Sequence, residues 1–221
     1  MPLLFSYSVR NAFARKLTGT LTVAGIALVV FVFCAVLMLA DGLEQTLTDT
    51  GSDKNVIVNR KSANTELVSI INRSNADIIK SDPAVVREAD GTPRFTGEVV
   101  VLIGLNKKSD SNMVNVNVRG GSAASFTVRP IVKLTQGSMY RPGTSEIMVG
   151  AKVAKGYWGT GQGDRLRFGG RDWTIVGIFE AGGSGFENEI WGDYDQLAAV
   201  FDRPVYSSLT FEMVPGTDFV A

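Results

Sequence analysis

The sequence contains no histidine, and its only cysteine is Cys34. Without histidine, catalytic triads and dyads that use an imidazole base are excluded, and so are zinc sites built on histidine. The chain has 22 basic and 22 acidic residues, so it lacks the excess positive charge that binds nucleic acid. These absences argue against most hydrolases and against a nucleic-acid partner. A domain without a disulfide must also be held together by its own core.

One long stretch, residues 17–40, carries no charge and consists almost entirely of apolar side chains. As a helix rising about 1.5 Å per residue it would be about 36 Å long, enough to cross a hydrocarbon core of about 30 Å. Basic residues precede it and acidic residues follow it: Arg10, Arg15 and Lys16, then Asp41 and Glu44. The positive-inside rule therefore predicts a cytoplasmic N-terminus and an extracytoplasmic remainder, with the membrane crossed once within this sequence.

A cleaved signal peptide is the alternative for this stretch. Such a peptide has an apolar core of about 7–15 residues and ends in a small-x-small site. The stretch here is longer, and Leu37-Met38-Leu39-Ala40 lacks the small residue three positions before a cut after Ala40. We therefore interpret residues 17–40 as a retained transmembrane helix.

Residues 1–16 are predicted to form a short amphipathic helix on the cytoplasmic side. Phe5, Val9 and Phe13 recur at a spacing of four, and cationic residues occupy other faces. Two interpretations remain open. The helix could lie in the membrane interface and contact a cytoplasmic partner, or it could simply extend the transmembrane helix with snorkelling cations.

Residues 41–221 form the predicted extracytoplasmic domain, which is large enough for a substantial core. The sequence of this domain predicts short strands, glycine turns and a few short helices, and this mixture indicates an α+β fold. The expected strands are 55–59, 98–105, 113–119, 146–149, 165–168, 173–179 and 207–213. The expected helices are 41–50, 74–80, 151–157 and 193–201.

Three local patterns lead to specific expectations. In residues 113–119, valine alternates with asparagine and arginine, so Arg119 is placed on the exposed face of a half-buried strand. Residues 169–172 (GGRD) lie between two expected strands and predict a β-hairpin whose turn is formed by Gly169 and Gly170. Asp193 and Gln196 have the spacing of a capping box at a helix start, and Ser74 is expected to cap residues 74–80.

Three glycine clusters invite comparison with phosphate-binding loops: Gly120-Gly121, residues 159–163 and residues 182–185. None has the spacing of a P-loop followed by Lys-Ser/Thr, and the second precedes an expected strand and not a helix. We interpret all three as turns. The chain is therefore not expected to hydrolyse ATP itself.

Acidic residues gather near the end of the chain: Glu180, Glu187, Glu189, Asp193 and Asp195. A catalytic carboxylate pair or a hard-metal site would use such residues, but no ligand spacing is present, and a solvated face is predicted. Trp158, Trp173 and Trp191 are expected in the core or at an interface. The sequence thus predicts no catalytic, cofactor-binding or metal-binding residue, no cofactor and no enzymatic activity.

The order of several short motifs resembles the N-terminal half of FtsX-like, MacB-type ABC transporter permeases. The opening, from Asn11 through residues 15–17, 21–22 and 25–27, is similar to the family's first span. The outer segment is similar to a MacB-like periplasmic core domain over residues 117–120, 137–143, 146–150, 163–166 and 173–179.

This resemblance implies a permease with four spans whose outer domain lies between the first and second. It further implies a cytoplasmic ABC ATPase subunit, a second permease copy or paralogue, the lipid bilayer and in some systems a periplasmic adaptor protein as partners. The outer domain would move with the membrane helices and act on a lipid, lipoprotein, peptide or drug. In such proteins this domain has a β-rich subdomain, which we place at about residues 94–189.

The resemblance also implies three later spans and an ATPase-docking loop, none of which lies within the 221 residues. We therefore expect a truncated permease or a split gene product that cannot transport alone. The alternative function is a membrane-anchored binding or scaffold protein without transport. A neighbouring ATPase gene would separate the two.

Overall fold

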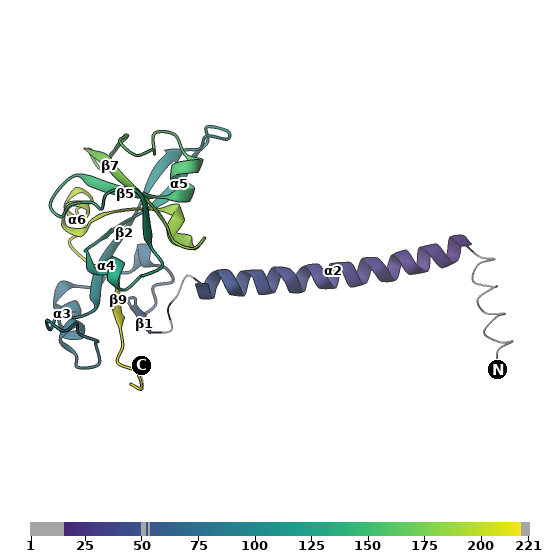
Figure 1. Cartoon of the computed structure of the whole chain (residues 1–221), viewed down its shortest axis with the longest axis horizontal. Coiled ribbons are helices and arrows are strands. Elements are labelled where there is room, and N and C mark those ends of the chain that lie inside the picture. Colours follow the sequence, from purple (N-terminus) through teal and green to yellow (C-terminus); the bar gives the residue numbers. More distant parts are fainter. Residues whose placement is uncertain (1–15, 50–51, 53, 218–221) are drawn as a thin grey trace. The chain divides into compact units, whose positions relative to one another are not determined.

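The computed structural model describes residues 16–49, 52 and 54–217, in two units that are considered separately. The first unit ends at Thr48 and contains the helix α2 (Lys16–Asp49) except for its last residue, and the second is the domain that begins at Asp49 (Figure 1). The helix predicted for residues 1–16 lies outside the described residues, apart from Lys16.

Helix α2 is continuous over 34 residues. Within it, Gly19–Leu43 is long and apolar enough to cross a membrane, and its apolar side chains, such as Phe31 and Met38, are exposed. In a bilayer these side chains would contact lipid, while the helix satisfies its own backbone hydrogen bonds. The helix predicted for residues 17–40 and its expected extension into residues 41–49 are both present.

The domain contains a nine-stranded mixed sheet in the order β1-β9-β2-β3-β8-β5-β7-β4, with β6 paired to β7. Its strands are β1 (Asn55–Val58), β2 (Phe95–Asn106), β3 (Met113–Gly121), β4 (Lys133–Gly137), β5 (Glu146–Gly150), β6 (Arg165–Phe168), β7 (Arg171–Glu180), β8 (Glu189–Asp193) and β9 (Ser208–Glu212). Its helices are α3 (Arg73–Ser81), α4 (Ala124–Thr127), α5 (Ala151–Gly156) and α6 (Tyr194–Val200), with 3₁₀ turns η1 (Glu66–Val68) and η2 (Gly185–Asn188).

Most neighbouring strands are antiparallel, but β3 is parallel to β8 and β5 is parallel to β7. The last strand, β9, lies between β1 and β2, so the end of the chain returns to the start of the domain. This mixed sheet with short helices confirms the α+β fold class. The placement of a β-rich subdomain at residues 94–189 stays a prediction, because β2 pairs with both β9 and β3.

The core consists of one large and two smaller groups of buried apolar side chains. The large group comes from β2, β3, β5, β6, β7 and β8 together with α5 and α6, and it includes Trp173 of β7, which is fully buried. A second group surrounds Trp191, and a third joins β9 to α3 and β1. Two of the three tryptophans therefore lie in the core, as expected, whereas Trp158 is exposed.

The β6–β7 hairpin has its turn at the glycine pair, as predicted, and β7 begins two residues earlier than expected. Gly169 and Gly170 alone form the turn, with φ of 57° and 73°, whereas Arg171 and Asp172 already belong to β7. Two consecutive residues in the left-handed region are typical of a type I′ turn, whose twist matches that of the strands.

The predicted capping box at α6 is wrong. Asp193 is the N-cap residue, but its carboxylate accepts a hydrogen bond from the Gly143 backbone N–H at 3.1 Å. The Gln196 side chain instead accepts a hydrogen bond from Arg171. Both side chains therefore form hydrogen bonds with residues distant in sequence and not with the backbone at the start of α6. Helix α3 likewise begins at Arg73 with Asn72 as its N-cap residue, and not at Ser74.

Gly120 and Gly121 do not form a turn, contrary to the prediction, because they are the last residues of β3. A Cβ at Gly120 would contact Val99 and Leu197, and one at Gly121 would collide with the Ser125 hydroxyl. Glycine is therefore required here for close packing. The other two clusters contain the left-handed glycines of turns, at Gly159, Gly163, Gly182 and Gly183.

Candidate functional site: a buried charge cluster

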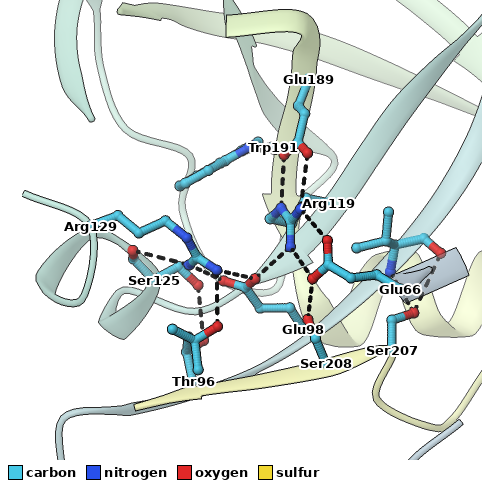
Figure 2. Close-up of polar contacts among 12 residues, drawn as sticks. Glu66, Thr96, Glu98, Arg119, Ser125, Arg129, Glu189, Trp191, Ser207 and Ser208 are labelled. Carbon is cyan, nitrogen blue, oxygen red and sulfur yellow. Dashed lines mark hydrogen bonds and ion pairs between the residues drawn. The ribbon is translucent and has the colours of Figure 1, made fainter. Parts of the chain in front are cut away.

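Arg119 lies at the centre of a buried group of charged side chains (Figure 2). Its guanidinium forms two parallel hydrogen bonds with Glu189, from Nε to Oε2 at 2.7 Å and from Nη2 to Oε1 at 2.9 Å. Nη1 donates to Glu98 Oε2 at 2.8 Å. Nη1 and Nη2 also donate to the two carboxylate oxygens of Glu66, at 3.0 and 2.9 Å. Arg119 thus binds three carboxylates from β8, β2 and η1.

A second arginine, Arg129, completes the cluster on the other side of Glu98. Its Nη1 and Nη2 donate to Glu98 Oε1 and Oε2 at 2.6 and 2.8 Å, and Nη2 also donates to Thr210 Oγ1 at 3.1 Å. Glu98 is fully buried and is therefore shared by two guanidinium groups. Since Arg129 follows α4 and Thr210 lies in β9, this half joins two further parts of the domain to β2.

Aromatic rings and hydroxyl groups surround the charges. The Trp191 indole N–H donates to Glu189 Oε2 at 2.9 Å, and the Phe186 ring lies 5.1 Å from the Arg129 guanidinium carbon. The hydroxyls of Thr96 and Ser125 are 2.9 Å apart beside Glu98 (Figure 2). These neighbours exclude water and leave the ionic groups to satisfy one another.

Burial alone would raise the pKa of the Glu66 carboxyl, but the charge of Arg119 and hydrogen bonds from Arg119 and Ser208 lower the pKa to about 2. For Glu98, burial is again opposed by both arginines, and the net effect lowers its pKa. Burial opposes the charge on Arg119, yet the neighbouring carboxylates raise its pKa well above the usual range. These groups therefore stay ionised near neutral pH.

Chemically, this arrangement is suited to holding structure and not to proton transfer. A general base needs a pKa near the working pH and access to its substrate, whereas Glu98 is fully buried with a lowered pKa. Each oxygen of Glu98 accepts a charge-assisted hydrogen bond. The cluster ties β2, β3, β8, β9, η1 and the segment after α4 into one body.

The five acidic residues near the end of the chain do not share one surface. Glu189 belongs to the cluster, and Glu187 accepts hydrogen bonds from the backbone N–H groups of Ala181 and Gly183 at 3.0 and 2.7 Å. Glu187, Glu189 and Asp193 are buried, so the prediction of a solvated face is wrong for these three. Each is buried with a partner that the local pattern does not identify.

The run's other members, Glu180 and Asp195, are exposed, and Asp195 pairs with Arg73 at 3.0 Å. Within the described residues, no group of three or more His, Cys, Asp or Glu side chains is placed to hold a metal ion.

Sequence reasoning also misplaced or missed other cluster members. Alternation places Arg119 on the exposed face of its strand, but the residue is only 3% exposed. The sequence places Glu98 in a buried strand without identifying its partner, and no local pattern identifies Glu66 or Arg129 as members of the cluster. One usable signal existed: a carboxylate at the start of an apolar run such as EVVVLIGL must find a cation if it is buried.

The fold is similar to solved outer domains of membrane transporters. The periplasmic region of MacB from Actinobacillus actinomycetemcomitans aligns at 14% identity with a TM-score of 0.55, over 77% of this chain and 78% of that chain. The extracellular domain of the noncanonic ABC-type transporter YknZ from Gram-positive bacteria aligns at 12% identity with a TM-score of 0.52, over 73% and 84%. At these identities the likeness concerns the fold. A comparison with curated protein sequences gave no match.

The fold class of the domain is therefore that of these outer domains. The sequence model of the family described as MacB-like periplasmic core domain matches residues 20–221, and the chain belongs to that family. The resemblance stated from the sequence motifs is thus confirmed. Together with the apolar helix, the family indicates a membrane-anchored protein of the ABC transporter permease type.

Proposed function

We propose that this chain is the first transmembrane helix and the extracytoplasmic domain of an ABC transporter permease. A cytoplasmic ATPase subunit would hydrolyse ATP, and the membrane helices would pass the resulting movement to the domain. The domain would then act on a lipid, lipoprotein, peptide or drug. The observation that carries this proposal is that one family match spans both the apolar helix and the domain, over residues 20–221.

Two features of the chain support a mechanical role. A single helix cannot line a transport pathway, so α2 needs other helices, and the small residues Gly19, Ala24, Gly25 and Ala27 permit close packing. The buried charge cluster joins the neighbouring strands β9, β2, β3 and β8, which favours their movement as a body. In this proposal the partners are a second permease copy or paralogue and, in some systems, a periplasmic adaptor.

The proposal places the N-terminus in the cytoplasm and the domain outside a bacterial inner membrane. Single-cysteine labelling tests this orientation in a Cys34→Ser background. Ser109→Cys lies at an exposed position between β2 and β3, and Ser6→Cys precedes the helix. A membrane-impermeant maleimide added to intact spheroplasts should label Ser109→Cys alone and should label Ser6→Cys only after permeabilisation. The opposite pattern, or a mature protein that begins near Asp41, would overturn the proposal.

The ATPase partner is tested by affinity purification of the intact gene product from its native membrane. We expect an ABC ATPase to copurify, and its ATPase activity to change when the permease is present. A matched control carries Gly25→Leu and Ala27→Leu, which leave the span apolar but remove the small residues, and should recover less of the helical partners. Repeated purification of the intact protein without an ATPase would favour the scaffold function instead.

A further inference from the structure

Residues 60–70, which we call the strap, connect β1 to the region of α3 and contain η1. The strap is not paired with any strand of the described sheet. Of its backbone groups, only the carbonyls of Leu67 and Ser69 form hydrogen bonds with the remainder of the described domain. Within the strap Ser69 is buried, whereas its neighbours Val68 and Ile70 are exposed. The strap is therefore a separate layer over the domain.

Two arginines of the domain hold the strap down. Arg119 donates two hydrogen bonds to the Glu66 carboxylate, which also accepts one from the Ser208 hydroxyl. Arg203 Nη2 donates to the backbone carbonyls of Leu67 and Ser69 at 2.8 and 2.9 Å. These are the hydrogen bonds that the described structure forms between residues 60–70 and the remainder of the domain.

The charge balance of the cluster distinguishes Glu66 from the other members. With Glu66, three carboxylates face two guanidinium groups, so the cluster carries one surplus negative charge. Without Glu66, Arg119 still pairs with Glu189, Arg129 still pairs with Glu98, and the buried charges balance. The Glu66 side chain is also 28% exposed, whereas that of Glu98 is fully buried. The Glu66 carboxylate can therefore move away from Arg119 without leaving a buried charged group unpaired.

We propose that the strap is a releasable latch, closed by the Glu66–Arg119 pair and opened when β1 is displaced. Strand β1 runs directly into the strap and begins at Asn55, six positions after α2 ends at Asp49. Along the chain, movement of the membrane helix would therefore reach β1, which pairs with β9, and then pass directly into the strap. This role rests on the proposed function, but the latch itself is a property of the chain alone.

Hydrogen exchange read by mass spectrometry on the full chain in lipid nanodiscs tests the latch. In Glu66→Ala, peptides that cover residues 60–70 should exchange about tenfold faster or more, since charge-assisted hydrogen bonds are lost. Peptides from β2, β3 and β8 should keep their protection. Glu88→Ala is the matched control, because it removes a carboxylate paired with Arg94 at 2.7 Å and should leave the strap unchanged.

Glu98→Ala tests a carboxylate that should not be removable without damage to the fold. It leaves Arg129 without its carboxylate partner and should therefore raise hydrogen exchange throughout the sheet. If Glu66→Ala leaves exchange of the strap unaltered, or raises exchange in β2, β3 and β8 by the same factor, the latch is refuted. Neither result depends on an ATPase or on transport. Failure of the latch is therefore distinguishable from failure of the proposed function.

Discussion

Arg119 and Glu189 face each other through two parallel hydrogen bonds of 2.7 and 2.9 Å, and they join the parallel neighbours β3 and β8. Both side chains are buried, and they lie 70 positions apart in the sequence. A bidentate pair of this kind fixes both distance and orientation between the strands. It is therefore a structural joint, and substitutions around it should affect stability strongly.

Replacement of the central arginine should destabilise the domain more than any exposed substitution. Arg119→Met would leave several buried carboxylates with one guanidinium, and loss of one partner in such a network costs about 3–5 kcal/mol in the free energy of unfolding. Arg119→Lys should fall between Met and the native residue, because an ammonium keeps the charge but not the bidentate geometry. Urea unfolding followed by fluorescence of the buried Trp173 and Trp191 measures both. A loss below about 1 kcal/mol for Arg119→Met would contradict this account.

Close packing at the end of β3 should make Gly121 intolerant of a side chain. Gly121→Ala would place a Cβ against the Ser125 hydroxyl, and overpacking of this kind costs about 1–3 kcal/mol. Ser125→Gly removes the obstacle and should recover part of the loss in the double variant. Gly185→Ala, where a Cβ meets open space, serves as the control and should change stability by less than about 0.5 kcal/mol. Equal effects at Gly121 and Gly185 would disprove the packing argument.

Acid should weaken the cluster in a defined window of pH. The folded pKa of Glu66 is about 2, below its ordinary value of 4.5, because Arg119, Arg129 and Ser208 favour the carboxylate, despite burial that opposes it. Stability from Glu66 is therefore fully present above about pH 5 and is lost as the pH falls toward 2, by at most about 3 kcal/mol. Glu98, whose pKa is also lowered, acts in the same direction.

The measurement for this window is the free energy of unfolding between pH 7 and pH 2 for the native chain and for Glu66→Gln. The variant cannot gain a proton at residue 66, so its stability should fall less steeply with acid. The two curves should converge at low pH. Parallel curves would mean that Glu66 does not contribute through its charge.

The β6–β7 turn offers a test at two adjacent glycines. Both have positive φ, but a Cβ at Gly170 meets open space, whereas one at Gly169 would collide with the Val200 side chain. Gly170→Asn should therefore be nearly neutral, since asparagine tolerates the left-handed region. Gly169→Asn should cost about 1–3 kcal/mol through overpacking against α6. Thermal unfolding of the two variants compares them directly, and similar losses would exclude Val200 as the cause.

Much of the local structure was predictable because its signals are local. Strands β1, β3, β5 and β9 lie within a few residues of the expected ranges, since alternation and glycine boundaries reveal them. Strand β4 (Lys133–Gly137) was missed, because all five residues are exposed at the edge of the sheet and show no apolar pattern. Its pairing with β7 is formed through the backbone.

The charge cluster was not predictable for a different reason. Alternation correctly buried Val116 and Val118, but it could not show that carboxylates of the neighbouring strand β8 and of η1 meet Arg119 on the other face of β3. The predicted capping box is absent for a similar reason. Gly143 donates a hydrogen bond to Asp193, and Arg171 donates one to Gln196. In each case a partner distant in sequence decided the outcome.

By itself, the sequence determined the membrane-length helix, the α+β texture of the domain and the family. Each follows from composition, periodicity or motif order, and these do not depend on how distant segments meet. The tertiary structure alone decided the strand order, the burial of Arg119 with its carboxylates and the attachment of the strap. The physical reason is that a charged side chain is stable in a core only beside its counter-charge, and that neighbour exists only once the chain has folded.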